Sequence, residues 1–521
     1  MYNPITITSR RINIFKPSFK FWPLLNCEYG KNIISKCLLR KVHKFSHSTN
    51  PTFAASFRLA IIGSGPAGFY TAYHMLKEHP SSLVDMYEAL PMPFGLVRYG
   101  VAPDHPEVKN VQNRFDEVAR DARFTFIGNV KFSKELKIAD LKSHYDAIVL
   151  SYGASQDKRL NIKNEDDSIR SVFSARAFVG WYNGLPQHRD LQPVLTCSDS
   201  AMIIGHGNVA LDVARILLTD IDELSKTDIT EYALECLRTS RIRNITLIGR
   251  RGPLQVSFTA KELREMMHLP NTRFHTDTEL VKTELSENTE LISQNRPLKR
   301  LMQILESGTI KTVGEKSWSL KFLRSPAEFI TRDNGDPSQP KFIRAVKFHI
   351  NKLEGPPDNR VAVPTGVMEE IETNLVFKSV GYKSTPVEGV PFDEKKGLVP
   401  NIKGKVVDKS GNELPGLYVS GWLKRGPQGV ISTTMYDAFE TAEIIVSDIQ
   451  QNKPMLSDTT DNYPKRGAKA IIPILHERGV RTVSYVDWKK IEQKEFEAGK
   501  QKHKPREKYS KIEEVLGILD K

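Results

Sequence analysis

The chain is poor in cysteine and has no long hydrophobic run. Its 521 residues include four cysteines, and no two of them are spaced as a CxxC pair or as the ligands of a metal-binding motif. A disulfide framework, a zinc site and a redox-active dithiol are therefore not expected, and we predict no metal centre. No apolar stretch approaches the roughly 18 residues that a membrane-spanning helix needs. We expect no membrane span, while a peripheral membrane contact stays open.

Acidic residues are almost absent from the first 50 residues. Lysine and arginine recur there together with serine and threonine, against one acid, Glu28. A basic, acid-poor leader is typical of a mitochondrial transit peptide, here with a cleavage site within residues 40–56. The alternative is a disordered basic tail that binds an anionic surface. We expect residues 1–50 to direct the protein to the mitochondrial matrix, and association with the inner membrane stays open.

The rest of the chain is long enough for two or three domains, and a glycine-rich motif lies near its start. In "FRLAIIGSGPAGFY" an apolar strand leads into Gly63, Gly65 and Gly68, and a helical pattern follows. The first glycine permits a tight turn, the second lets the backbone approach a pyrophosphate, and the third lets helix and strand pack closely. The next predicted strand ends at Glu88, where a carboxylate that binds a ribose belongs. This pattern predicts a dinucleotide site.

A second stretch, "SAMIIGHGNVALDVARILL", repeats the pattern with alanine in the third position. The next strand of this unit, "NITLIGRRGP", ends with Arg250 and Arg251 instead of an acid. A carboxylate would repel a 2′-phosphate, whereas paired guanidinium groups form charge-assisted hydrogen bonds with one. The alternative is an exposed basic turn. We predict that this second site binds NADP.

Two such sites in one chain suggest FAD as the bound cofactor and NADPH as the diffusible one. Two apolar strands that end in Gly153 and Gly381 are interpreted as crossings between two domains. A further strand in "GLYVSGWLKRGPQGVISTTM" leads through a Gly/Pro loop into a helix that begins near Ser432. The positive end of that helix suits the flavin edge that becomes negative on reduction. An ordinary strand, loop and helix is the alternative.

These motifs occur together with longer, chemically arbitrary stretches. They include "PFGLVRYGVAPDHPEVKN", "SARAFVGWYNGLP", "GRRGPLQVSFTAKELREM", "PTGVMEE", "GYKSTPV" and the tail "KPREKY". From about Arg58 to the C-terminus the chain resembles the mitochondrial adrenodoxin reductase (NADPH–ferredoxin reductase) family. The leader and residues 275–345 match least.

The resemblance implies an α/β fold with two Rossmann-like dinucleotide-binding domains. The FAD-binding domain is then discontinuous, with the NADP-binding domain inserted in it. The expected boundaries are 56–157 for the first part of the FAD-binding domain, 158–387 for the NADP-binding domain, and 388–521 for the second part of the FAD-binding domain with a C-terminal tail.

The resemblance also implies site residues. Expected FAD contacts are Ala67, Glu88, Leu96, Phe132, Trp422, Gly429, Val430 and Ile431. Expected NADP contacts are His206, Gly207, Asn208, Val209, Arg250, Arg251, Glu262 and Gly429. His206 stands where relatives often have glutamine. His105 and Asp212 match a His and an Asp near the flavin, where they would relay a proton or couple the flavin charge to the docking face. The alternative for Asp212 is an acid that complements the helix dipole.

Without a CxxC pair beside the flavin, a one-electron carrier is the expected acceptor, and the family uses a small acidic [2Fe–2S] ferredoxin. Arg296, Lys299 and Arg300 form a candidate docking cluster, which would speed encounter with an acidic partner. A solvated charge run is the alternative. No nucleic-acid recognition motif accompanies these residues, so we expect no nucleic-acid partner. We also expect the protein to be a monomer.

Two other functions stay open at this point. One is a flavoprotein that feeds electrons to a quinone or to a larger complex, and the other is a nucleotide-responsive binding protein without turnover. The ferredoxin isoform and the pathway served, cytochrome P450 hydroxylation, haem modification or iron–sulfur cluster assembly, also stay open.

Overall fold

The computed structural model describes residues 56–307, 314–332, 339–456 and 465–520, all within a compact unit that spans Ala55–Lys521. The predicted leader, residues 1–50, lies outside the described residues. No helix among the described residues is both long and apolar enough to cross a bilayer.

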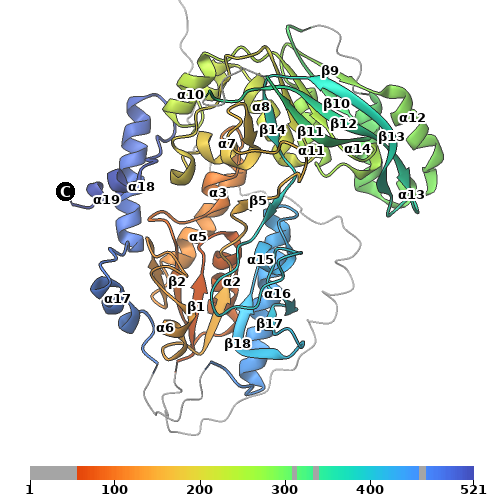
Figure 1. Cartoon of the computed structure of the whole chain (residues 1–521). Coiled ribbons are helices and arrows are strands. Elements are labelled where there is room, and N and C mark those ends of the chain that lie inside the picture. The colour runs from red at the N-terminus through yellow and green to blue at the C-terminus, as the bar shows by residue number, and fades with distance from the viewer. Residues whose placement is uncertain (1–55, 308–313, 333–338, 457–464, 521) are drawn as a thin grey trace, which may run out of the picture. The chain divides into compact units, whose positions relative to one another are not determined.

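A seven-stranded sheet combines strands from both ends of the described chain (Figure 1). Its order is β16-β17-β18-β4-β1-β2-β3, parallel from β18 to β3 and antiparallel at β17 and β16. The strands are β1 (Arg58–Ile62), β2 (Leu83–Tyr87), β3 (Phe124–Ile127), β4 (Ala147–Leu150), β16 (Asn401–Ile402), β17 (Lys405–Val407) and β18 (Glu413–Val419). We call this sheet and the helices packed on it the first module.

Strand β1 shows why this sheet is buried on both faces. Leu59 and Ile61 contact α2 (Pro66–Glu78), α5 (Val111–Ala119) and α16 (Ile431–Gln450). Ala60 and Ile62 point to the other face, toward α6 (Ile138–Lys142) and α17 (Ala468–Glu477). A strand buried on both faces needs apolar residues at every position rather than at alternate ones, which explains the continuous run that the sequence shows.

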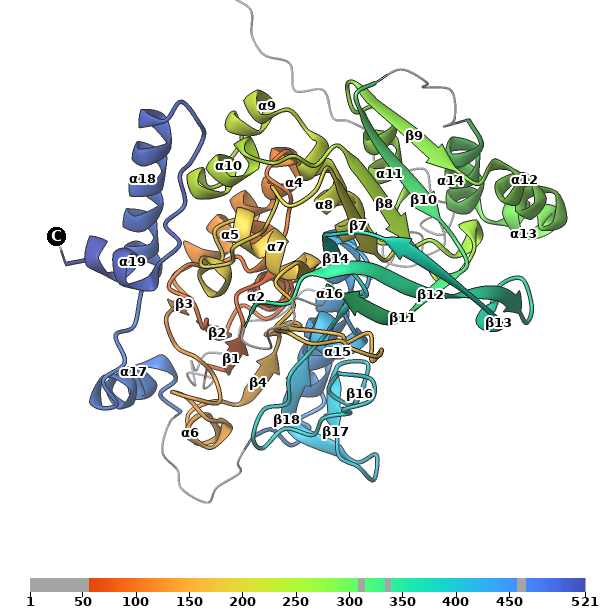
Figure 2. The same cartoon turned by 45° about the horizontal axis from the view of Figure 1, so that its top comes forward.

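The second module is built on a six-stranded, wholly parallel sheet of order β6-β14-β7-β8-β10-β9 (Figure 2). The strands are β6 (Val172–Ser174), β7 (Ser200–Ile204), β8 (Asn244–Ile248), β9 (Thr272–Thr276), β10 (Lys316–Lys321) and β14 (Val376–Lys378). Its helices are α7 (Ala175–Tyr182), α8 (Asn208–Leu218), α9 (Ile221–Ser225), α10 (Glu231–Arg238), α11 (Ala260–Met267), α12 (Thr278–Glu287), α13 (Thr289–Gln294) and α14 (Arg296–Ser307).

A separate antiparallel sheet covers one face of the second module. It consists of β11 (Arg324–Thr331), β12 (Ile343–Glu354) and β13 (Val361–Glu372). Met202 and Ile204 of β7 pack against Val346 and Phe348 of β12, while Ala201 and Ile203 face the helices. Much of the stretch 275–345, which the sequence left unplaced, thus belongs to α12–α14, β10 and β11.

The two modules are joined by a short antiparallel ribbon. Strand β5 (Gln156–Asp157) pairs with β15 (Tyr382–Lys383), and these strands follow β4 and β14 respectively. The predicted crossings, near Gly153 and Gly381, are therefore adjacent in space. Together with the two parallel sheets this confirms the expected fold class, while the exact domain boundaries stay a prediction.

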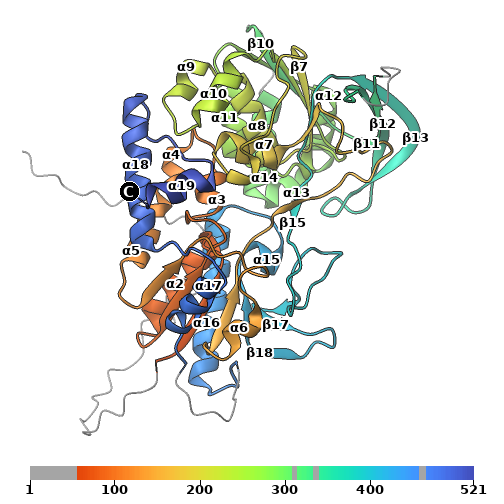
Figure 3. The ribbon, with the colours of Figure 1, turned by 60° about the vertical axis from the view of Figure 1, so that its left-hand side comes forward.

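The remaining helices are short or C-terminal. They are α3 (Leu96–Tyr99), α4 (Pro106–Lys109), α15 (Trp422–Arg425), α18 (Tyr485–Gln501) and α19 (Ile512–Ile518), with 3-10 turns at Pro186–His188 and Pro253–Gln255. Figure 3 shows α18 and α19 near α3 and α4, and an ion pair joins Arg98 of α3 to Glu495 of α18.

Candidate functional site: two glycine loops and an ionised cluster

The first glycine loop lies between β1 and α2. Gly63 has a φ of 106°, and a Cβ there would lie 2.7 Å from the Ser151 carbonyl oxygen, just beyond β4. A Cβ on Gly68 would lie 2.1 Å from the carbonyl oxygen of Gly63, so α2 packs against the loop backbone. A Cβ on Gly65 would meet nothing within 4 Å, and no side chain caps the helix that begins beside it. This open approach and the uncapped helix N-terminus suit a pyrophosphate.

Glu88 is held at this loop by hydrogen bonds. One carboxylate oxygen accepts from the Ser64 amide at 2.9 Å and the Ser64 hydroxyl at 2.6 Å, and the other accepts from the Leu90 amide at 3.0 Å. The acid at the end of β2 is thus beside the glycine loop, as the sequence predicted.

The second loop repeats this geometry between β7 and α8. Gly205 has a φ of 134°, and a Cβ there would lie 2.1 Å from the Ser379 carbonyl oxygen, just beyond β14. A Cβ on Gly207 would meet nothing within 4 Å. Asn208 and Val209 follow as the first residues of α8, which also lacks a side-chain cap. The Asn208 side-chain oxygen accepts from the Thr259 amide at 2.8 Å, which ties the loop to the start of α11.

His206 lies between the two glycines of the second loop and is packed against the neighbouring strands. Its ring lies against Gly249, where a Cβ would be only 2.3 Å from Nδ1, and makes an edge contact with Phe322 at 5.1 Å between ring centroids. Nε2 lies 3.1 Å from the Leu247 carbonyl oxygen. Burial lowers the pKa of His206 to about 4, so the ring is neutral and donates to that carbonyl.

Arg250 and Arg251 follow β8 on the same side of the sheet as the second loop. Their backbone carbonyls accept from the Asn351 side chain at 2.8 Å and the Leu323 amide at 3.2 Å, which hold the turn. Within the described residues neither guanidinium has an ion pair. Burial and the charge of Arg250 lower the pKa of Arg251. The two cations therefore repel each other, and a bound dianion would relieve that repulsion.

The C-terminal stretch returns to the first loop. A Cβ on Gly421, which has a φ of 72°, would lie 2.5 Å from the Cβ of Ala67, so the chain after β18 crosses the start of α2 in close contact. Trp422 follows directly, with its ring 6.0 Å from that of Tyr382 in the inter-module ribbon. Gly429 has a φ of 80° and leads into Val430 and Ile431 at the uncapped start of α16.

Two other expected FAD contacts lie at the edges of this region. Leu96 is 40% exposed and follows Gly95, where a Cβ would lie 3.1 Å from the Cα of Gly65. The half-buried Phe132 follows β3 and packs on the opposite face of the sheet, in the cluster that contains Ile62.

An ionised cluster lies where the two modules meet. Arg215 of α8 bonds to Asp104 at 2.6 Å and to Asp212 at 2.7 Å, and it lies 3.5 Å from Glu262 of α11. Burial raises the pKa of Asp212. Burial and the neighbouring Asp212 raise the pKa of Glu262 to about 7. The cluster thus contains a carboxyl group, that of Glu262, which can exchange a proton near neutral pH.

His105 joins this cluster through a partner that the sequence did not indicate. Its Nε2 lies 3.0 Å from Glu265 of α11, whereas no direct contact with Asp212 occurs. His105, Glu262 and Glu265 place ligand-type atoms within 4.8 Å of one another, but Arg215 and Lys261 already provide positive charge there. Arg215 and Glu265 lie three residues after Asp212 and Glu262, a helical spacing that offered a signal for finding them.

The predicted docking residues Arg296, Lys299 and Arg300 are exposed on the first turns of α14, whose buried face carries Leu301 and Met302. Within the described residues no ion pair neutralises these three cations. The cluster is therefore free to meet an acidic surface.

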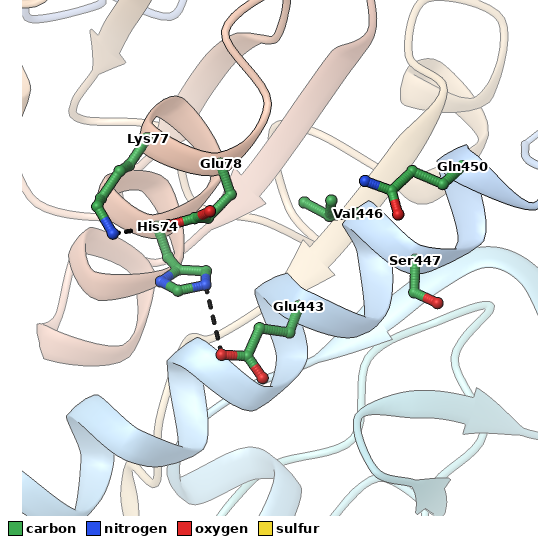
Figure 4. Close-up of a pocket in the computed structure, with 7 residues that line it drawn as sticks. All are labelled: His74, Lys77, Glu78, Glu443, Val446, Ser447 and Gln450. Carbon is green, nitrogen blue, oxygen red and sulfur yellow. Dashed lines mark hydrogen bonds and ion pairs between the residues drawn. The ribbon is translucent and has the colours of Figure 1, made fainter. Parts of the chain in front are cut away.

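A cleft of about 410 Å³ opens between the C-terminal halves of α2 and α16, away from the glycine loop (Figure 4). His74 lies 3.6 Å from Glu443 across it and stacks on Phe439 at 4.7 Å. Burial lowers the pKa of His74. The helices begin at the nucleotide loop and end at this cleft, so it is separate from the site described above.

Comparison with known proteins identifies similar chains. The pyridine nucleotide-disulphide oxidoreductase family matches residues 57–298. The mitochondrial NADPH:adrenodoxin oxidoreductase of Bos taurus is 46% identical over 473 residues, 89% of this chain and 92% of its own. The mitochondrial NADPH:adrenodoxin oxidoreductase of Arabidopsis thaliana is 44% identical over 88% of this chain and 94% of its own. Among solved structures, Mycobacterium tuberculosis FprA in complex with NADPH has a TM-score of 0.80 at 36% identity, over 89% of this chain and 99% of its own.

Proposed function

The chain belongs to the family of mitochondrial NADPH:adrenodoxin oxidoreductases, and from this premise we propose which residues do each part of the work. The protein is an FAD-dependent oxidoreductase that takes electrons from NADPH and passes them to a ferredoxin of the adrenodoxin type. Bound FAD supplies the ability to accept a hydride and to release electrons one at a time.

We assign FAD to the first module. Gly63, Gly65, Ala67 and Gly68 would receive its pyrophosphate, because the loop is open at Gly65 and the helix N-terminus is uncapped. Glu88, already fixed by Ser64 and Leu90, would accept from a ribose hydroxyl. The contacts expected at the edges and at the C-terminal return are Leu96, Phe132, Trp422, Gly429, Val430 and Ile431.

NADPH is assigned to the second module. His206, Gly207, Asn208 and Val209 would line its pyrophosphate, and Arg250 with Arg251 would bind the 2′-phosphate. The contrast between the anchored acid at the end of β2 and the two unpaired cations at the end of β8 carries this assignment. We accordingly propose that the NADP-binding domain consists of residues 158–387 and that the FAD-binding domain consists of residues 56–157 and 388–521.

Glu262, His105 and Asp212 are assigned to the meeting point of the two cofactors. Glu262 would contact the nicotinamide half of NADPH, since it lies between α8 and α11 beside the second loop. Asp212, which bonds to Arg215, and His105, which pairs with Glu265, would relay a proton or couple the flavin charge to the docking face, although they make no bond to each other. This arrangement would compensate the charge that reduction of a flavin creates.

The ferredoxin would dock on Arg296, Lys299 and Arg300, whose charges are unpaired and exposed. The relatives are mitochondrial proteins. For this chain we propose the matrix, a monomeric state, and a peripheral contact with the inner membrane.

A stopped-flow comparison of NADPH and NADH, with and without a [2Fe–2S] ferredoxin, tests the proposal. The flavin absorbance should bleach much faster with NADPH, and cytochrome c reduction should require the ferredoxin and weaken as salt rises. Turnover that does not depend on ferredoxin would favour a quinone or another acceptor, and equal bleaching by both nucleotides would contradict the role of Arg250 and Arg251.

A further inference from the structure

The C-terminal tail "KPREKY", residues 504–509, turns back on α18 and enters the second module. A Cβ on Gly499 would lie 2.5 Å from the Cα of Arg506, which shows how closely the tail packs on the helix. The Lys504 ammonium donates to the Ile229 carbonyl oxygen at 2.6 Å, and the Glu507 carboxylate accepts from the Glu231 amide at 3.1 Å. The Lys504 side chain is 1% exposed, so this is an interior contact.

The other side of the tail is bound to the first module. Arg506 donates to Glu492 at 2.8 Å and to Glu495 at 3.2 Å, both on α18. The Glu495 carboxylate also accepts hydrogen bonds from both terminal nitrogens of Arg98, a buried residue of α3. Since α3 begins at Leu96, beside the first glycine loop, this chain of ion pairs connects the tail to the expected FAD site.

The tail, the first module and the second module meet at one carboxylate. Asp228, between α9 and α10, accepts from Lys109 at 2.6 and 2.8 Å and lies 2.9 Å from the ammonium of Lys508. The Lys508 side chain is 1% exposed, and those of Lys109 and Asp228 are 12% and 16% exposed. Lys109 ends α4, the short helix that begins directly after His105. The contact with Asp228 is thus one helical turn away from His105, which faces Glu265 of α11.

From these contacts we infer that the junction of Lys109, Asp228 and Lys508 holds the two modules in the register that hydride transfer requires. The three residues are positioning residues, because within the described part of the chain none of them contacts a residue that is expected to bind a cofactor. The inference rests on the proposed assignment of one dinucleotide to each module. Its physical reason is that a carboxylate shared by two lysine amino groups from different segments is satisfied at one relative placement. A small misplacement of reacting groups slows a reaction strongly.

Other ion pairs bridge the same region but are poorer candidates. Lys261 and Glu107 are both more than half exposed, so water competes with that pair. Arg215 is buried and Asp104 is half-buried, but Arg215 also touches Asp212 and Glu262 and belongs to the site itself. At Asp228 the Lys508 side chain is buried and the other two are at most 16% exposed, and the junction is separate from that cluster.

The test compares Lys508→Met with Lys502→Met in the FAD-containing full-length protein. Lys508→Met removes the tail's amino group from the junction but leaves the pair between Lys109 and Asp228. Lys502→Met removes an exposed lysine between α18 and the tail, which lies 3.9 Å from Glu507. Flavin content, the Kd for NADP⁺ and the rate constant of flavin reduction at saturating NADPH are measured for both.

We expect Lys508→Met to keep its flavin and to bind NADP⁺ within about twofold of the wild type, since each module holds its own nucleotide. Its rate of flavin reduction at saturation should fall about tenfold or more, with a deuterium isotope effect from 4-deuterated NADPH that shows hydride transfer as the slowed step. Lys502→Met should match the wild type. Lys109 binds the same carboxylate from α4. Lys109→Met should therefore show the same result, a slower flavin reduction with an unchanged affinity for NADP⁺.

Reduction within twofold of the wild type in both Lys508→Met and Lys109→Met would overturn the inference. A parallel loss of NADP⁺ affinity, or a slowed reduction without an isotope effect, would also overturn it, because either would indicate general damage. If Lys508→Met does not fold, the decision rests on Lys109→Met. A wild-type protein that NADPH does not bleach would instead refute the proposed function.

Discussion

Replacing Arg250 and Arg251 with alanine should convert the second module from an NADP site to one that no longer distinguishes NADP from NAD. The turn itself should persist, because the Asn351 side chain and the Leu323 amide hold it through backbone carbonyls. The glycine loop before α8 is untouched by the change, so pyrophosphate binding should also persist.

The size of the effect follows from the burial of the two side chains. A hydrogen bond to a charged group contributes roughly 1.5–3 kcal/mol. Arg250 is exposed and Arg251 is half-buried, so the lower end of that range applies to each. The pair then contributes about 3 kcal/mol toward a 2′-phosphate, and since every 1.4 kcal/mol is a factor of ten, the affinity for NADPH should fall roughly a hundredfold.

The assay measures kcat/KM for NADPH and for NADH with ferricyanide as the acceptor, which removes the ferredoxin from the comparison. The double alanine variant should lose about two orders of magnitude with NADPH and change little with NADH. Arg241→Ala is the matched control, since it removes an exposed arginine before the same strand. An equal loss with both nucleotides, or no loss with NADPH, would refute the assignment of these arginines.

Three further predictions concern charge. Changing Arg296, Lys299 and Arg300 to glutamine should raise the KM for ferredoxin severalfold at low salt and less at high salt, with ferricyanide reduction unchanged; a salt-independent effect would argue against docking there. The raised pKa of Glu262 means that the folded protein holds more protons between pH 4.5 and about 7, so this group costs stability as pH rises through that window. Glu262→Gln should therefore raise the unfolding free energy of the NADP-free flavoprotein by up to about 3 kcal/mol above pH 7, seen as a higher Tm, and leave both unchanged at pH 4.5. For His206, whose pKa is lowered from 6.5 to about 4, the unfolded chain holds more protons in that window and stability falls as pH drops through it; His206→Gln should remove that part of the acid sensitivity in thermal unfolding, and an unchanged pH profile would contradict the burial of a neutral ring.

The sequence by itself determined the two dinucleotide units. Each unit is a contiguous strand, glycine loop and helix, and the need for glycine is local, since a positive φ and a close carbonyl exclude any side chain at Gly63 and Gly205. The residues that distinguish the units, Glu88 and Arg250, end the second strand of each. Their place beside the loops follows from parallel pairing of neighbouring strands.

Only the tertiary structure decided which ionised groups meet. His105 faces Glu265 rather than Asp212, and the three-stranded sheet covers one face of the second module. Helical spacing places Glu265 on the same helix face as Glu262, but nothing in the sequence pairs it with His105. Hydrophobic patterning likewise records that a face is buried but not what covers it. The tail that brings Lys508 to Asp228 joins residues that are 280 positions apart. Such contacts depend on how whole segments pack. From the sequence alone, each of these charged residues would be expected on the surface, because its buried partner lies far away in the chain.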